Sequence, residues 1–349
     1  MGYKKIILTL GVLTMGLYTV RNVIGNKNVT DKNKIKSKTE ISDTKETVRN
    51  TERTEERIYL TADSTIRALL EYKRIKRFSR FILPLEWGYS ENTKLGEIDY
   101  LLPYHSNIKP ETTIKAINYI IGETEKGNEI FFDIYTEDEK KQDRTKENTG
   151  LFFFRGKENA PFAVINAGGG FSYVGSIHEG FPYAMEINRM GYNAFVLQYR
   201  IGDSRKAVED LIRAIDFIFK NSRELKVGSK NYSIWGSSAG ARMAYAAGIE
   251  DGRHFGNTRI EKPSMIVVMY TGQSYFSHND PPTFIGVGEN DRIASPQVVE
   301  KRAEDMRKAG VKVKFYKYRN VGHGFGLGIG TSAEGWTKEA VKFWEEQMR

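Results

Sequence analysis

The stretch Tyr232–Gly240 reads YSIWGSSAG, an apolar run that leads into a serine flanked by glycines. Its last five residues fit the pattern G-x-S-x-G, and the residues 241–249 that follow have helical composition. A strand, a tight turn at a serine and then a helix form a nucleophile elbow, in which the serine hydroxyl stands clear of the backbone. The stretch therefore predicts a nucleophilic serine at Ser238.

A glycine-rich turn follows another predicted strand. The segment Asn166–Phe171 reads NAGGGF and comes directly after the apolar run 162–165. Consecutive glycines leave backbone N–H groups free to face one point, as stabilisation of a developing oxyanion requires. We predict an oxyanion hole formed by the N–H of Ala239 together with that of Gly169 or Gly170. The alternative is a phosphate site, but no G-K-[ST] sequence is present and no acidic ribose partner stands at the usual offset.

A carboxylate and an imidazole follow two later predicted strands. Asp291 ends the segment GVGEND and is a candidate to hold an imidazole in one tautomer. Glu289 is the rival carboxylate, and a helix N-cap is the alternative role for Asp291. His323, one of only five histidines, lies between two glycines, where an exposed imidazole can act as a general base.

With the order Ser238, Asp291, His323 in place, residues from about Glu129 to the C-terminus resemble the α/β-hydrolase superfamily. The closest likeness is to the esterase/lipase branch, which includes hormone-sensitive-lipase-like carboxylesterases and bacterial acetyl-xylan and feruloyl esterases. One departure is Asn166, which stands where the H-G-G-G motif has histidine. The resemblance is carried by Asn166–Phe171, Tyr199-Arg200, Gly236–Gly240, Asp291 and His323-Gly324-Phe325.

This resemblance implies an α/β fold with a mostly parallel sheet and ester hydrolysis through an acyl-enzyme, without a cofactor. In that reading Ser238 attacks the ester, His323 takes its proton and Asp291 orients the imidazole. A small-molecule or carbohydrate ester with a short acyl group, such as acetyl, is the expected substrate, because the sequence leaves little room for a wide lid. A serine peptidase of the same fold and a non-catalytic, membrane-tethered binding protein are the alternatives.

Three further residues are candidates for substrate contact. Tyr173 and His178 follow the glycine-rich turn, and Tyr275 follows a later strand, so all three could face the same cleft. The alternative for the first two is a helix start that packs on the sheet. The chain has no cysteine and no H-E-x-x-H pattern, so we expect no disulfide and no metal.

Charge is concentrated in the N-terminal part. Residues 1–80 carry 18 Lys and Arg against 9 Asp and Glu, whereas residues 81–349 carry 35 of each. We expect residues 1–80 to contact a membrane or another anionic surface, although a solvated helix face is the simpler reading of the basic run 71–80. Nucleic acid is not expected, because that run lacks the regular aromatic interleaving of a stacking platform.

The N-terminus combines Lys4-Lys5 with the apolar run Ile6–Val20, which predicts a signal peptide or membrane anchor over residues 1–25. The run is shorter than the roughly 20 residues of a membrane-spanning helix, and no clear cleavage site follows it. We expect an exported or membrane-anchored protein. The lysines after the run favour the alternative, a membrane-associated body in the cytoplasm.

Three further segments differ in composition. Residues 26–57 are charged and polar with few apolar side chains, which predicts a disordered tether. Residues 58–128 show helical apolar spacing over 63–79 and again over 114–121. We expect them to form a helical extension that packs on a catalytic domain at 129–349 and roofs its pocket.

Beyond residue 129, predicted strands and helices alternate. Residues 129–135 and 151–155 are predicted as an antiparallel pair joined by a charged loop, 136–149. The remaining pattern predicts a mostly parallel sheet with helices on both faces. Its strands are expected over 162–166, 193–199, 231–235, 265–270, 284–287 and 311–317, and its helices over 178–190, 205–222, 238–249, 296–309 and 332–348.

Overall fold

The computed structural model describes residues 57–249 and 260–348. The predictions for the segments 1–25 and 26–57 therefore lie outside the described residues, apart from Arg57. Within the described ranges, none of the helices is long and apolar enough to cross a bilayer.

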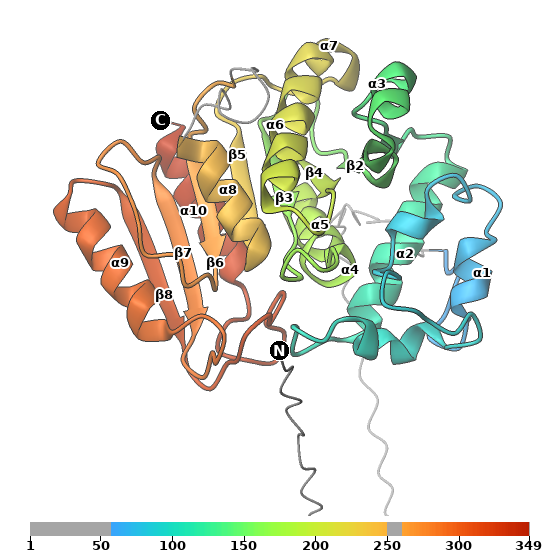
Figure 1. The fold of residues 1–349 in the computed structure, drawn as a ribbon, viewed down its shortest axis with the longest axis horizontal. Helices are drawn as coiled ribbons and strands as arrows, with labels where there is room; N and C mark the ends of the chain where they lie inside the picture. The colour runs from blue at the N-terminus through green and yellow to red at the C-terminus, as the bar shows by residue number, and fades with distance from the viewer. Residues whose placement is uncertain (1–56, 250–259, 349) are drawn as a thin grey trace, which may run out of the picture. The chain divides into compact units, whose positions relative to one another are not determined.

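In the described residues, eight strands form one sheet in the order β1-β2-β4-β3-β5-β6-β7-β8 (Figure 1). The pairs β1/β2 and β2/β4 are antiparallel, and the other neighbours are parallel. This confirms the predicted α/β fold with a mostly parallel sheet. The strands are β1 Phe131–Phe132, β2 Gly150–Phe154, β3 Phe162–Asn166, β4 Asn193–Gln198, β5 Ser233–Ser237, β6 Met265–Met269, β7 Thr283–Gly288 and β8 Val313–Tyr318.

Helices cover both faces of the sheet. Helices α6 (Ser204–Lys220) and α8 (Ala239–Ile249) bury their apolar residues on one face, and α5 (Phe181–Arg189) and α10 (Trp336–Gln347) bury theirs on the other (Figure 1). Helix α9 (Pro296–Lys308) packs beside β7 and β8. Because both faces are covered, the central strands are buried along their whole length, as their continuous apolar sequences predict.

Helix α6 shows how local sequence sets these elements. Its N-cap is Asp203, whose carboxylate accepts the N–H groups of Arg205 and Lys206 at 2.8 and 3.3 Å. The apolar stripe that follows also contains Asp210, which is fully buried and pairs with Arg200 at 2.7 Å. Asp203 thus caps the helix, whereas Asp210 pairs with Arg200, which follows the end of β4.

The extension is less helical than its spacing suggests. Helix α1 spans only Ile66–Leu70, and the chain continues in turns in which the N–H groups of Tyr72, Ile75 and Phe78 each bond to the carbonyl three residues earlier. Apolar residues three apart are buried by such turns as well as by a helix, which is why the predicted helix over 63–79 is wrong. The later prediction is right, since α2 covers Pro110–Glu125.

The extension has no core of its own. Its buried residues Ile66, Ile75 and Ile117 belong to the same apolar cluster as Val196 of β4 and Phe325 near the C-terminal end of the sheet. The hydrophobic effect therefore holds the extension against the side of the sheet that α5 covers. This contact brings the segment after residue 101 close to the carboxyl ends of the strands.

Two connections differ from prediction. The supposed loop 136–149 contains α3 (Glu137–Gln142), which begins at a capping box between Thr136 and Glu139, a signal overlooked in the sequence. The single helix expected over 178–190 is divided at Gly180, where a Cβ would lie 2.6 Å from a methyl group of Val196. The other short segments are η1 Ser79–Phe81, η2 Leu95–Leu101, η3 Arg144–Asn148, α4 Ser176–Glu179 and α7 Ser222–Leu225.

The buried pair formed by Asp210 of α6 and Arg200 leads to a stability prediction. Asp210→Asn leaves the Arg200 guanidinium without its fully buried carboxylate, and we expect the free energy of unfolding to fall by about 3 kcal/mol. The matched control is Asp203→Asn, which keeps an N-cap side chain and should change stability by less than about 0.5 kcal/mol. Urea unfolding of both variants measures the difference. Equal losses of unfolding free energy in the two variants would contradict the stabilising role of the Asp210–Arg200 pair.

Candidate active site

Ser238 occupies the tight turn that its sequence predicts. It lies between the end of β5 and the start of α8 with φ of 51°, a left-handed conformation. A Cβ on Gly236 would lie 2.1 Å from the carbonyl oxygen of Gly240, and one on Gly240 would lie 2.0 Å from that of Asn166. Both glycines are therefore required by close backbone packing. Ala239 is the first residue of α8, so its N–H has no partner within the helix.

Three side chains from different strand ends are hydrogen-bonded in series. Nε2 of His323 lies 3.0 Å from Oγ of Ser238, and Nδ1 lies 2.8 Å from Oδ2 of Asp291. The other carboxylate oxygen of Asp291 accepts the N–H groups of Ile293 and Ala294 at 2.8 and 2.7 Å. The carboxylate is thus held on both oxygens, and the imidazole is oriented toward the serine.

The glycine-rich turn lies directly beside Ser238. A Cβ on Gly168 would approach the Cβ of Ser238 to 3.0 Å. The N–H of Gly168 is already engaged, since it donates to Oε2 of Glu179 at 2.6 Å. The N–H groups of Gly169 and Gly170 have no acceptor among residues 57–249 and 260–348, and Gly169 has φ of 133°. These two donors remain available for an anionic oxygen next to Ser238.

A buried carboxylate, that of Glu179, holds this turn through contacts that no sequence motif marks. Glu179 is fully buried and accepts a hydrogen bond from Tyr270 at 2.6 Å on Oε1, while Nε2 of His105 lies 3.2 Å from Oε2. Nδ1 of His105 lies 2.8 Å from the hydroxyl of Tyr173. Burial alone would raise the pKa of Glu179, but His105 and these hydrogen bonds lower that pKa to about 2. The side chain is therefore ionised at neutral pH.

A second missed contact holds the His323 loop. Ser106 of the extension donates its hydroxyl to the carbonyl of His323 at 2.6 Å and its N–H to the carbonyl of Gly324 at 2.9 Å. Nε2 of His178 lies 3.0 Å from that same Gly324 carbonyl. Burial and the nearby His105 lower the pKa of His178 to about 4, so the ring is neutral and donates to the carbonyl. No sequence motif marks His105 or Ser106; the scarcity of histidine was the only signal.

The structure gives the other predicted residues different surroundings. Tyr173 and His178 are buried, and their polar atoms bond inside the protein, so they brace the site and we revise the prediction that they contact substrate. Tyr275 is 63% exposed, with its ring 5.3 Å from that of Tyr245, and its substrate contact stays a prediction. The rival carboxylate Glu289 is exposed and accepts a backbone N–H from Asn320 at 3.2 Å.

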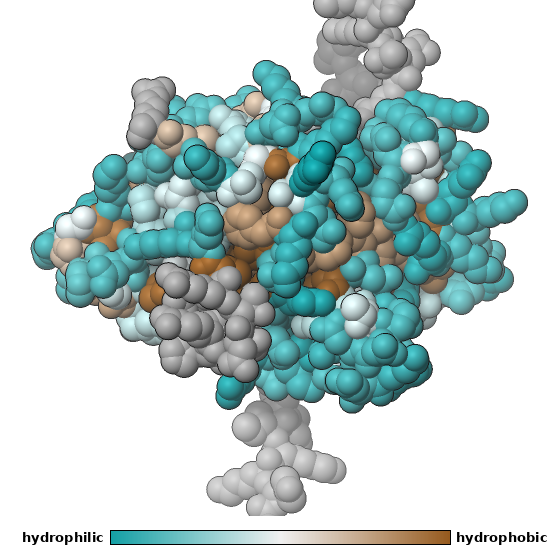
Figure 2. Space-filling model, turned by 90° about the horizontal axis from the view of Figure 1, so that it is seen from above, coloured by the Kyte–Doolittle hydropathy of each residue, from teal (hydrophilic) through white to brown (hydrophobic). Residues whose placement is uncertain are grey.

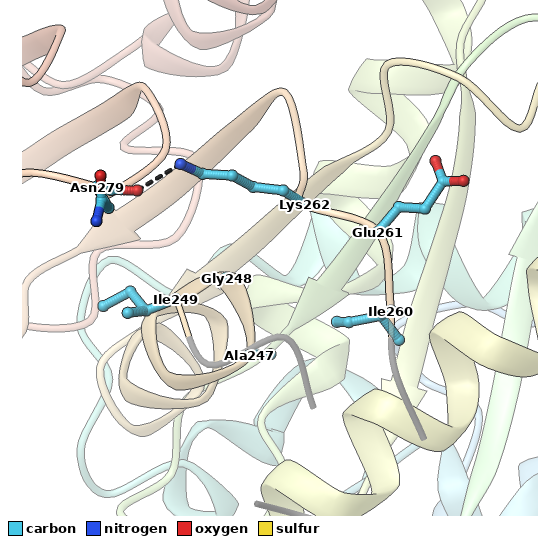
Figure 3. Close-up of a pocket in the computed structure, with 7 residues that line it drawn as sticks. All are labelled: Ala247, Gly248, Ile249, Ile260, Glu261, Lys262 and Asn279. Carbon is cyan, nitrogen blue, oxygen red and sulfur yellow. Dashed lines mark hydrogen bonds between the residues drawn. The ribbon is translucent and has the colours of Figure 1, made fainter. Parts of the chain in front are cut away.

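A 690 Å³ pocket lies far from these groups. It is formed where α8 ends and β6 begins, and Lys262 crosses it to the carbonyl of Asn279 (Figure 3). Ligands of open α/β sheets bind at the carboxyl ends of the strands, where Ser238 lies, so this pocket is at the opposite end of the sheet.

Figure 2 looks onto the end that carries α7, where hydrophilic residues surround a smaller hydrophobic group. Within the described ranges, no group of three or more His, Asp or Glu side chains could hold a metal.

Comparison with known proteins places this geometry in a family context. Residues 154–266 match the BD-FAE family model. Two curated relatives are each 25% identical to the chain. An endo-1,4-beta-xylanase B of Butyrivibrio fibrisolvens aligns over 50% of this chain and 34% of the relative. An acetylxylan esterase of Xylanibacter ruminicola aligns over 46% of this chain and 40% of the relative. The chain thus spans less than half the length of either relative.

A solved structure agrees with the fold. The acetyl ester-xyloside bifunctional hydrolase of Caldicellulosiruptor lactoaceticus is 22% identical and superposes with a TM-score of 0.51, covering 57% of this chain and 88% of that protein. Together with the family match, this confirms the predicted α/β-hydrolase fold and the resemblance to its esterases.

The buried imidazole of His178 predicts an acid response. Its folded pKa is about 4, below the usual 6.5, so the unfolded state binds more protons and stability falls as pH drops from about 6.5 toward 4. The loss in the free energy of unfolding should approach about 3 kcal/mol, and His178→Gln should make stability depend less on pH over this range. Thermal unfolding between pH 7 and 4.5 measures both, with exposed His278→Gln as the control. An equally steep loss in His178→Gln would contradict this origin.

The Glu179 contacts predict an effect on turnover. His105→Ala removes the ring whose Nε2 lies 3.2 Å from Oε2 of Glu179, so the carboxylate holds Gly168 less firmly, and we expect kcat to fall about tenfold to a hundredfold with KM little changed. His105→Gln can still donate to Glu179 and should recover part of kcat. Ester hydrolysis and thermal unfolding of both variants check this. A loss that only follows thermal stability would contradict a positioning role.

Proposed function

Because this chain is an α/β-hydrolase-fold protein whose central segment matches the BD-FAE family, we propose that it is a serine carboxylesterase. The observation that carries the proposal is the hydrogen-bonded series from Ser238 through His323 to Asp291. A nucleophile, a base and an orienting carboxylate are the three groups that acyl transfer through serine requires. They lie at the carboxyl ends of three parallel strands.

The reaction follows from these positions. Oγ of Ser238 attacks the ester carbonyl while Nε2 of His323 takes the hydroxyl proton, and Asp291 stabilises the imidazolium. The tetrahedral intermediate then loses the alcohol, which leaves with the proton from His323. A water molecule attacks the acyl-enzyme with His323 again as base, and release of the acid restores the Ser238 hydroxyl.

Charge on the carbonyl oxygen needs donors that are already in place. The N–H groups of Gly169, Gly170 and Ala239 border the serine and have no other acceptor among the described residues. Their fixed orientation avoids reorganisation during the reaction, which is the main source of catalysis by such donors.

We propose short acyl groups, such as acetyl on a carbohydrate, as the substrates. The connection from Tyr270 to Pro282, between β6 and β7, contains no helix, so it does not form a large lid over a long acyl chain. The names of the relatives, an acetylxylan esterase and a xylanase, are consistent with an acetylated polysaccharide.

The test is hydrolysis of p-nitrophenyl esters from acetate to octanoate. Wild type should be most active on acetate, and Ser238→Ala should lose at least about a thousandfold in kcat because the nucleophile is gone. Ser237→Ala is the matched control: its hydroxyl points to Tyr183 at 3.3 Å, and activity should stay within a few-fold. Full activity of Ser238→Ala would refute the mechanism, and inactivity of wild type on every ester would favour a peptidase or a binding protein.

A further inference from the structure

A second cavity lies near the glycine-rich turn 166–171, called the oxyanion turn below. Its lining includes Val174, which follows the turn, and Tyr199, whose hydroxyl donates to the carbonyl of Ala167 at 2.8 Å. It has a volume of 340 Å³, within the range of small-molecule sites. One wall is the extension, and the other is the carboxyl end of β4 with the turn after β3. Its lining residues are Arg80, Phe81, Leu83, Leu85, Glu86, Tyr89, Asn148, Val174, Gln198, Tyr199 and Ile201.

We propose that this cavity is a carbohydrate subsite, which binds a sugar unit of the substrate remote from the ester that is cleaved. The inference rests on the proposed esterase function and specifies its alcohol part. The observation that points to a ligand is an unpartnered polar group. Gln198 is only 5% exposed, and its Nε2 has no hydrogen-bond acceptor among the residues that the structure describes. A buried amide without a partner is costly, and a ligand oxygen would satisfy it.

The cavity has two charged lining residues, Arg80 and Glu86, which are exposed and of opposite sign. Arg80 also donates to the side chain of Asn148 at 3.0 Å. With no excess of either charge, the lining suits a neutral, hydroxyl-rich ligand. Glu86, Tyr89 and Gln198 together offer donors and acceptors to hydroxyl groups, while the apolar lining matches the C–H faces of a sugar ring.

Aromatic rings connect this cavity to the oxyanion turn. Trp87, between the lining residues Glu86 and Tyr89, is 58% exposed and donates its indole N–H to the carbonyl of Ser172 at 3.2 Å. Its ring lies 6.1 Å from that of Tyr104, which is 39% exposed and lies over Gly170.

An exposed indole held in place by its N–H presents a rigid apolar face at little entropic cost. This aromatic surface lies where a chain that runs from the ester toward the cavity would pass. The extension would therefore favour esters whose alcohol part is a polymer, and it would not affect the choice of acyl group.

The experiment compares two substrates, p-nitrophenyl acetate and an acetylated linear xylo-oligosaccharide. Trp87→Ala and Gln198→Leu should each lower kcat/KM for the oligosaccharide at least about tenfold more than kcat/KM for p-nitrophenyl acetate, because only the longer substrate reaches the subsite. Gln198→Leu keeps the side-chain volume and removes a buried unpaired amide, so it should fold. The control is Tyr100→Ala, whose ring is 51% exposed on η2 and does not line the cavity.

Binding is measured separately from hydrolysis. Calorimetric titration of Ser238→Ala with the unacetylated oligosaccharide should give binding that is lost when Trp87→Ala or Gln198→Leu is added. No binding, or binding indifferent to both substitutions, would overturn the subsite even if the esterase is active. An increase in octanoate hydrolysis by Gln198→Leu with sugar binding unchanged would identify an acyl pocket and also overturn it. Failure of wild type on all esters would overturn the proposed function instead.

Discussion

The position of the oxyanion turn depends on one buried carboxylate, that of Glu179. Removing a carboxylate from water costs several kcal/mol, so it persists inside a protein only when hydrogen-bond donors surround it. Here the donors are the N–H of Gly168, the hydroxyl of Tyr270 and Nε2 of His105. These contacts join the turn after β3, the end of β6 and the extension into one unit. If any one of these three segments is displaced, the carboxylate loses hydrogen bonds that offset the cost of its burial.

Packing and backbone conformation explain why the turn carries three glycines in a row: a Cβ on Gly168 would lie 2.8 Å from Oε2 of Glu179, and Gly169 and Gly170 have φ of 133° and 62°. Gly168 donates its N–H to Glu179, which leaves the next two N–H groups for the substrate oxygen. A negative carboxylate so near a developing oxyanion would oppose it electrostatically, and the opposition is stronger where water is excluded. The hydrogen bonds from Tyr270 and His105 point dipoles at the carboxylate and weaken that field, while the bond to Gly168 fixes the turn. The extension thus affects the electrostatics of the site without touching the reacting atoms.

The elements that sequence predicted well are those set by local chemistry. The elbow at Ser238 follows from glycine requirements within five residues, and Asp291 and His323 follow because each comes after a strand of a parallel sheet. The contacts that were missed join residues far apart: His105 and Glu179 stand in different segments, and no period or motif relates them. The extension was misread over 63–79 because a spacing of three fits both a helix and successive turns.

The boundaries of the site differ from those of the segment that matches the family. Residues 154–266 contain Ser238 and the glycine-rich turn, but Asp291 and His323 lie after that segment and His105 lies before it. Within the segment, Glu179 would be a buried anion without its contact to His105, and Ser238 would have no base. The hydrogen bonds from Ser106 to the His323 loop join a residue that precedes the segment to residues that follow it. The smallest unit in which this geometry is complete therefore includes the extension, because it supports both the oxyanion turn and the imidazole.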